Sequence, residues 1–160
     1  MKKLMLGLLS AGMVLGTLPV LAGSSANQTV TLQVSAINEI SISGNPGALT
    51  VNSATAGSAP NAVNDASTTY AITSNESDKK ITAAIDSAMP DGTTLTVNLG
   101  APTGATSAGA VALSTSAADV VTGITKLNES GKSISYSFSA TAAAGVVAST
   151  SRTVTLTVTD

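Results

Sequence analysis

The chain of 160 residues contains no cysteine, no histidine and no tryptophan, and aromatic residues make up only 2% of it. Without histidine and cysteine, it lacks the commonest general base, the thiolate nucleophile and the preferred ligands of transition metals. Ser/His, Cys/His and zinc chemistry are therefore excluded, and so are disulfide bonds. A folded domain of this composition must be held together by packing and sheet hydrogen bonds.

Charged residues are also scarce, because Lys, Arg, Asp and Glu together make up 10% of the chain, whereas about a quarter is usual. The abundant residues are small, hydroxylated or aliphatic: 45 are Ser or Thr, and 43% are hydrophobic. Threonine and the β-branched aliphatic residues favour strands. The composition therefore indicates a β protein built from small residues.

The beginning of the chain has the three parts of a secretory signal peptide. A lysine pair is followed by a nearly continuous apolar run from Leu4 to Val20, and Pro19 precedes a group of small residues. Cleavage is expected after Ala22, with Ala26 as the alternative. We therefore expect residues 1–22 to be a signal peptide and residues 27–160 to form one domain.

Export determines where the mature protein is expected to be. No later segment approaches the ~18 apolar residues of a transmembrane helix, so no membrane association is expected after cleavage. The expected location is extracellular or on the cell surface, with the periplasm as an alternative. Five basic residues then remain against nine acidic ones. Because nucleic acid requires a basic face, it is not an expected partner.

Alternation of apolar and polar residues at period two recurs along the chain and predicts strands with one buried face. The clearest cases are Lys132–Ala140 and Arg152–Thr159, which we expect to pair with each other. The same pattern occurs at Thr29–Ala36, Glu39–Ser43, Thr68–Ser74, Lys80–Ile85 and Thr94–Leu99. With turn residues between them, these segments predict an all-β fold, a single immunoglobulin-like antiparallel β-sandwich of about 8 strands.

Other segments break the alternation. Ser116–Val121 is predicted to form one helical turn, with Ser116 as its N-cap. Asn52–Ala66 and Gly100–Gly109 are rich in Ala, Gly, Ser and Thr and are predicted to be long loops. Phe138 is the largest purely apolar side chain of the domain, and alternation points it into the core, as it does Tyr70 and Tyr136.

The carboxylates do not suggest a catalytic site. Nearly all nine occupy predicted turns, and the chain has too few aromatic residues for a sugar-binding platform. We expect no enzymatic activity, no catalytic residues, no cofactor and no metal site. Calcium is the best chemical alternative, through Glu76 with Asp78 or Asp86 with Asp91. Neither pair has the alternating acidic spacing of a dedicated calcium loop.

The segment directly after the signal presents Val30, Leu32 and Val34 on one side of an extended chain. This segment is a candidate assembly strand, because alternate apolar residues on a free strand can complete the sheet of a neighbouring copy. The alternative is a first strand of its own sandwich that changes sheets near Ala36–Glu39. The predicted strands already suffice for a complete sandwich, which favours that self-pairing.

The leading strand, the cysteine-free Ser/Thr-rich domain and the closing strand Thr153–Val158 together resemble bacterial surface-fibre and pilin-type β-sandwich subunits, including the spore-coat-U-like group. The resemblance covers architecture and composition over residues 27–160. It implies a non-enzymatic subunit that is exported and assembles on the cell surface, and it carries over no functional residue.

Two functions are consistent with these observations. The first is a secreted, non-enzymatic structural subunit of a cell-surface or extracellular fibre, coat or matrix, which self-associates through the N-terminal strand. The second is a monomeric extracellular module that binds carbohydrate or protein through its two long loops.

Overall fold

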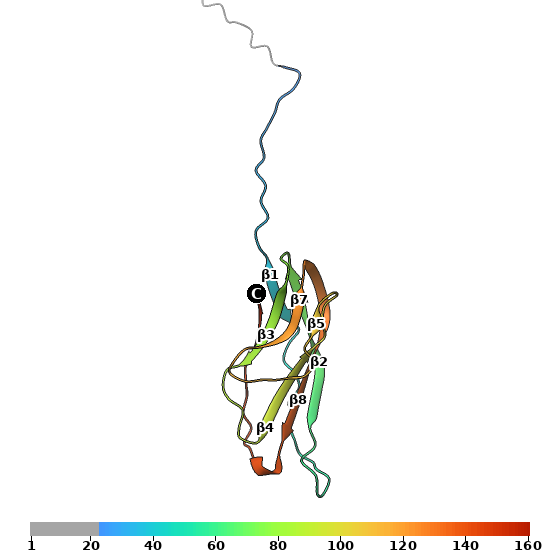
Figure 1. Ribbon diagram of the computed structural model, residues 1–160, viewed down its shortest axis with the longest axis vertical. Coiled ribbons are helices and arrows are strands. Elements are labelled where there is room, and N and C mark those ends of the chain that lie inside the picture. Colours follow the sequence, from blue (N-terminus) through green and yellow to red (C-terminus); the bar gives the residue numbers. More distant parts are fainter. Residues whose placement is uncertain (1–22) are drawn as a thin grey trace, which may run out of the picture. The chain divides into compact units, whose positions relative to one another are not determined.

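Nine antiparallel strands form two sheets in the part of the chain that this computed structural model describes, residues 23–160 (Figure 1). The first sheet has the order β1 (Asn38–Ile42), β2 (Val63–Ser74), β8 (Leu127–Ala140), β4 (Thr93–Leu99) and β6 (Val111–Ala112). The second has the order β5 (Thr106–Ser107), β7 (Ala118–Ile124), β3 (Lys79–Ile85) and β9 (Val154–Thr159). The all-β sandwich expected from the alternation is confirmed. The expected signal peptide lies outside the described residues.

The core lies between the two sheets and is almost entirely aliphatic. Nine of its side chains are essentially inaccessible to solvent: Tyr70, Ile72, Ile81, Val97, Leu99, Val120, Val121, Ile124 and Ile134. Alternation accounts for most of them, because in β3 and β4 every second residue is buried. Tyr70 is buried, and its hydroxyl group is satisfied because it donates a 2.7 Å hydrogen bond to the carbonyl oxygen of Gly100.

Phe138 points inward as expected but is only partly buried, although it packs against the core. Tyr70 and Tyr136 are both buried. The largest apolar side chain is therefore at the margin of the core, while the smaller aliphatic residues form its centre.

The expected pairing of the last two long strands is wrong. β8 has β2 on one side and β4 on the other, so both of its hydrogen-bonding edges are occupied. β9 instead crosses to the second sheet and pairs with β3 along its whole length, from Val154 opposite Ile85 to Thr159 opposite Lys80. The connecting segment contains a short 3-10 helix, Ala142–Ala144.

Two further expectations need correction. Ser116–Val121 is not a helical turn, because Ala118–Ile124 forms β7 and pairs with β3. A single turn of helix is costly to nucleate, whereas the ladder satisfies the same backbone groups and buries Val120 and Val121. The loop expected at Asn52–Ala66 ends early, because β2 begins at Val63. Gly100–Gly109 is mostly loop and contains the two-residue strand β5.

Candidate functional site

The segment before β1 is exposed and adopts no regular structure: residues 23–37 belong to no helix or strand. Its alternating apolar side chains are largely exposed, with Val30 at 69%, Leu32 at 87% and Val34 at 82% of full accessibility. Thr29–Ala36, which the alternation predicted to be a strand, is therefore not assigned to any strand. Exposing three aliphatic side chains on one side of a segment is unfavourable in water.

One lateral side of the sandwich has two free strand edges. β1 ends the first sheet and β9 ends the second, and the two strands approach each other without pairing. Along β9 the inward side chains Val154, Leu156 and Val158 pack against the core but remain partly exposed. An edge strand leaves alternate N–H and C=O groups unpaired, so β9 can accept a further strand. Sequence reasoning missed this edge because it paired β9 with β8.

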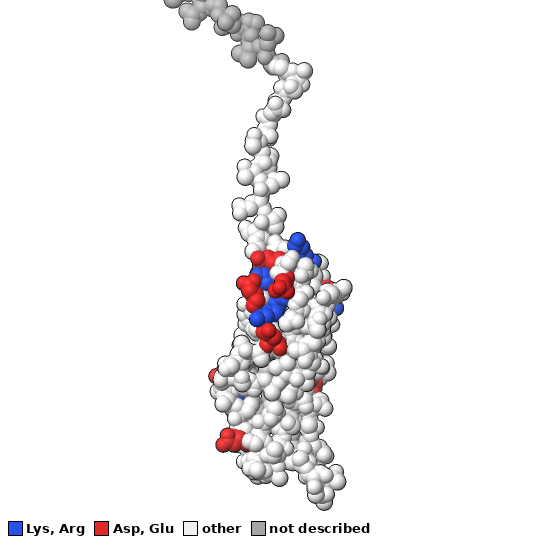
Figure 2. All heavy atoms as spheres, in the orientation of Figure 1, with Lys and Arg blue, Asp and Glu red and all other residues white. Residues whose placement is uncertain are grey.

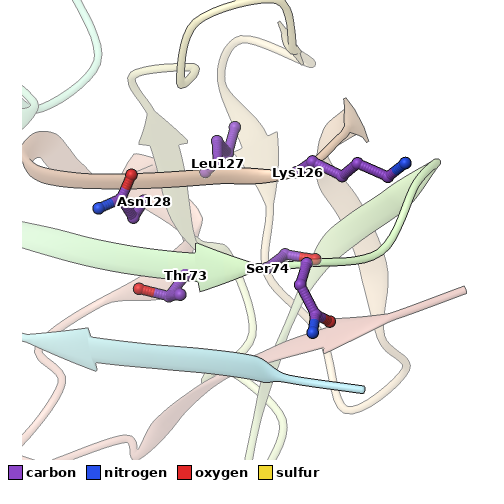
Figure 3. Close-up of a pocket in the computed structure, with 6 residues that line it drawn as sticks. Thr73, Ser74, Lys126, Leu127 and Asn128 are labelled. Atoms are coloured by element: carbon purple, nitrogen blue, oxygen red, sulfur yellow. The ribbon is translucent and has the colours of Figure 1, made fainter. Parts of the chain in front are cut away.

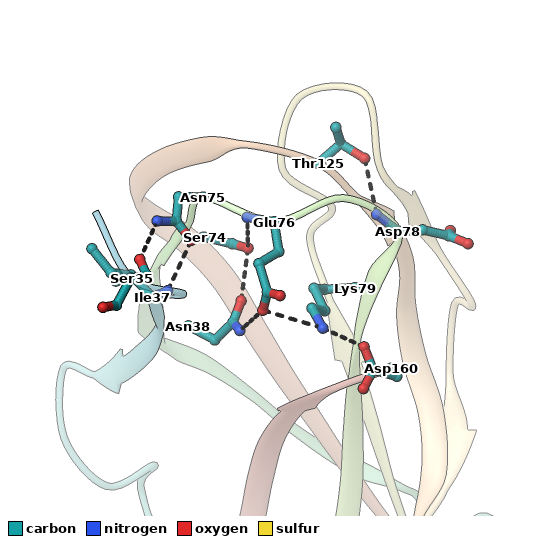
Figure 4. Close-up of polar contacts among 10 residues, drawn as sticks. All are labelled: Ser35, Ile37, Asn38, Ser74, Asn75, Glu76, Asp78, Lys79, Thr125 and Asp160. Carbon is teal, nitrogen blue, oxygen red and sulfur yellow. Dashed lines mark hydrogen bonds and ion pairs between the residues drawn. The ribbon is translucent and has the colours of Figure 1, made fainter. Parts of the chain in front are cut away.

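Asn75 binds the backbone at the end of the N-terminal segment, at Ser35 and Ile37 just before β1, as Figure 4 shows. Its side-chain Oδ1 accepts a 2.8 Å hydrogen bond from the backbone N–H of Ile37, and its Nδ2 donates a 2.7 Å bond to the carbonyl oxygen of Ser35. Its backbone N–H also donates to the carbonyl oxygen of Ile37, at 3.1 Å. These three bonds form what we call the Asn75 clamp. The alternation placed Asn75 only between the predicted strands Thr68–Ser74 and Lys80–Ile85.

A network of charges lies beside the clamp, at the end of the sandwich where β1 begins and β9 finishes. Lys79 bridges Glu76, at 3.2 Å, and Asp160. Asn38 donates to the same carboxylate oxygen of Glu76 and accepts from the hydroxyl of Ser74, at 2.7 Å. The network thus ties the edge strand of one sheet to the end of the other. Figure 2 shows acidic and basic side chains gathered at this end of the sandwich.

The same contacts shift the protonation equilibria of the network. The hydrogen bonds that Lys79 donates to Asp160 and Glu76 raise the pKa of its amine. The Asn38 hydrogen bond, followed by that of Lys79, lowers the pKa of Glu76. Lys79 likewise lowers the pKa of Asp160. All three groups are therefore held in their charged forms.

Two of the four carboxylates considered for calcium, those of Glu76 and Asp86, make other contacts. Glu76 is engaged by Lys79 and Asn38. Asp86 accepts from the backbone N–H of Thr153 at 3.1 Å, which anchors the start of β9. Within residues 23–160, no three acidic side chains converge in the way a metal ion requires.

Two shallow hollows lie on the described surface. One, of about 380 Å³, lies at the ends of β2 and β8 and is lined by Thr73, Ser74, Asn75, Lys126, Leu127 and Asn128 (Figure 3). A smaller one, of about 150 Å³, lies over β1 and β2. Residues of the two long loops line neither hollow. The most distinctive surface features are therefore the exposed N-terminal segment and the free edge of β9.

Comparison with known protein families, with curated proteins and with solved structures finds no match to this chain. Within residues 23–160, no helix has the length and apolar character needed to cross a membrane.

Proposed function

We propose that this chain is an exported structural subunit of an extracellular or cell-surface fibre, coat or matrix. In this assembly the N-terminal segment of one copy adds to the free edge of β9 in the next. The observation that carries the proposal is the coexistence, in one chain, of an exposed segment with Val30, Leu32 and Val34 on one side and a sheet edge with partly exposed apolar residues.

The chemistry of the two surfaces is complementary. The edge of β9 has backbone groups without a strand partner, and the segment brings an extended backbone to pair with them. Alternate side chains of an added strand point toward the core, where Val30, Leu32 and Val34 would join Val154, Leu156 and Val158. Burying each aliphatic side chain stabilises the contact by about 1.5 to 3 kcal/mol, before the entropy of ordering the segment is subtracted.

The direction of the strands supports a linear assembly. β1 begins and β9 finishes at the same end of the sandwich, where Asn38 and Asp160 share the network of Lys79. A segment that runs antiparallel to the neighbour's β9 has its Ala36 end at the opposite end of that neighbour. Its own domain follows there, so successive copies are joined head to tail. Such a heterologous contact generates a filament when the rotation between copies does not close into a ring.

The test is the substitution Leu32→Asp in the chain that begins at Gly23. Leu32 is 87% exposed, so the monomer should fold and melt as the parent chain does. A carboxylate against the apolar side chains of β9 costs several kcal/mol, which weakens assembly by at least about 100-fold. Light scattering after size-exclusion chromatography over a range of concentrations measures the assembly, and circular dichroism measures the melting.

Gln33→Asp provides the matched control, because position 33 points to the other side of an extended segment. We expect this variant to assemble like the parent chain. An equal loss of assembly in both variants would show that the added negative charge weakens assembly whichever side of the segment carries it. A parent chain that stays monomeric at all concentrations would contradict the proposal and favour the monomeric binding module that acts through its loops.

A further inference from the structure

The segment that can add to a neighbour's β9 is also covalently attached beside its own β9. Residues 29–36 lead into Asn38, which contacts the network that holds Asp160 at the end of β9. The local concentration of the segment at its own edge is therefore high, in the millimolar range for a short flexible connection. Assembly competes with self-insertion, and a fibre subunit requires some feature that disfavours the latter.

Self-insertion requires a particular path of the chain. β9 runs toward the end of the sandwich where β1 begins, because Asp160, which follows β9, and Asn38, the first residue of β1, both belong to the network around Lys79. A segment that lies along β9 and then enters β1 of the same chain must also run toward that end. It would be parallel to β9 and would have to reverse direction at residues 36–38.

The observed backbone just before β1 excludes that reversal. Ser35 and Ile37 are bonded to Asn75 on the side where β1 pairs with β2, and the next residue, Asn38, pairs with Ser74. The clamp thus extends the direction of β1 backwards beyond Asn38, as a further pair of bonded strand residues would. Reversal at 36–38 would break both side-chain bonds of Asn75.

We propose that Asn75 is a specificity-determining residue, whose clamp prevents the N-terminal segment from inserting beside β9 of its own chain and so reserves it for a second copy. This inference rests on the proposed function. The partner is another copy of this chain, and the clamp acts by positioning the segment, without contacting that partner.

The experiment compares the parent chain from Gly23 onward with Asn75→Ala and with the control Asn61→Ala. Asn61 donates a single side-chain bond to Ser53 in an exposed loop, so the control loses an asparagine bond away from the clamp. Two measurements are made on each chain: the mass by light scattering over a dilution series, and the hydrogen exchange of the β9 amides in the monomer fraction.

For Asn75→Ala we expect a monomer at concentrations at which the parent chain assembles, with the β9 amides exchanging at least tenfold more slowly than in the parent monomer. Deleting residues 27–36 from this variant should abolish that protection, because the inserted segment is then absent. Asn61→Ala should match the parent chain. Asn75→Asp, which retains an acceptor for Ile37 and loses the donor to Ser35, should be intermediate.

Two outcomes overturn the inference without affecting the proposed function. In the first, Asn75→Ala assembles like the parent chain. In the second, the parent chain assembles and Asn75→Ala stays monomeric, but the β9 amides of that monomer are not protected from exchange. A parent chain that never assembles overturns the proposed function and the inference together. The parent's behaviour thus distinguishes the two failures.

Discussion

Phe138 illustrates how the position of a residue in the core outweighs its size. It is the largest apolar side chain in the domain, yet it remains partly exposed, whereas Leu99 on β4 is fully buried. The free energy lost on truncation depends on the apolar area removed from water and on the cavity that is left. Size alone therefore overestimates the contribution of Phe138.

We expect Phe138→Ala to lower the free energy of unfolding of the monomer by about 2 kcal/mol, below the ~3 to 5 kcal/mol usual for a fully buried phenylalanine. Leu99→Ala should cost about 3 kcal/mol or more, because its site has no access to solvent. Urea denaturation of both variants measures the two values. A larger loss for Phe138→Ala than for Leu99→Ala would contradict this assignment of the core.

Glu129 on β8 makes the stability of the folded domain depend on pH. Its carboxylate is held by Lys132 and by the backbone N–H of Thr103, at 3.0 Å. The Lys132 contact, followed by the Thr103 bonds, lowers the pKa of Glu129 from 4.5 to about 2. A carboxyl group whose pKa is lower in the folded state stabilises the fold above its unfolded pKa. That stabilisation is lost as the pH falls from about 4.5 toward 2.

Glu129→Gln should therefore show a smaller decrease in melting temperature between pH 5 and pH 2 than the parent chain. Part of the decrease should remain, because Glu76 and Asp160 also have a lowered pKa. Asp91→Asn, at an exposed turn, is the control for the loss of one charge. Melting followed by circular dichroism across this pH range gives the comparison, and parallel curves for Glu129→Gln and the parent would refute the expectation.

At the scale of elements, the turn between β3 and β4 packs tightly against the segment that follows β8. Gly92 has a φ of +72°, and a Cβ there would lie 2.8 Å from Thr141 Oγ1 and 3.0 Å from the Cα of Ala144. Its carbonyl oxygen also accepts a 2.8 Å bond from the N–H of Thr141. The turn therefore helps to direct the chain from the first sheet to the second.

Gly92→Ala should destabilise the domain by more than Gly104→Ala. Both positions have positive φ, which costs a residue with a side chain about 1 kcal/mol, but a Cβ at Gly104 would meet nothing within 4 Å. The contacts at Gly92 should add about 1 to 3 kcal/mol. Chemical denaturation of the pair measures the difference, and equal losses would show that the segment after β8 shifts freely.

At the scale of the whole molecule, the proposed assembly depends on export and on the removal of the apolar leader. The sandwich begins well after the expected signal peptide, because Val34–Asp160 forms one compact unit. Cleavage would leave Val30, Leu32 and Val34 close to the new N-terminus, where the segment can reach a second copy.

We therefore expect the intact mass of the protein recovered from the secreted or surface fraction to correspond to a chain that begins at Gly23, or at Asn27 if the later site is used. Mass spectrometry of the full-length gene product expressed in a bacterial host with a secretory pathway gives this value. A mature product that still begins at Met1 would contradict export by a cleaved signal.

The sequence alone was sufficient for the class of fold, because the alternation that predicts a strand is a property of neighbouring residues. Lys80–Ile85 and Thr94–Leu99 form strands close to the expected bounds, and Lys132–Ala140 forms the second part of the longer strand β8, which begins at Leu127. The absence of cysteine and histidine likewise excluded whole classes of chemistry without reference to structure. The candidate assembly residues were also visible in the alternation of Val30, Leu32 and Val34.

Only the tertiary structure decided which strands are partners, because pairing depends on which edges remain free once the other strands are in place. β9 lies beside β3, since β2 and β4 already occupy β8. Residues 118–124 form β7 because their backbone groups pair with those of β3. The free edge of β9 and the Asn75 clamp likewise arise from residues far apart in sequence, brought together by packing that no local pattern encodes.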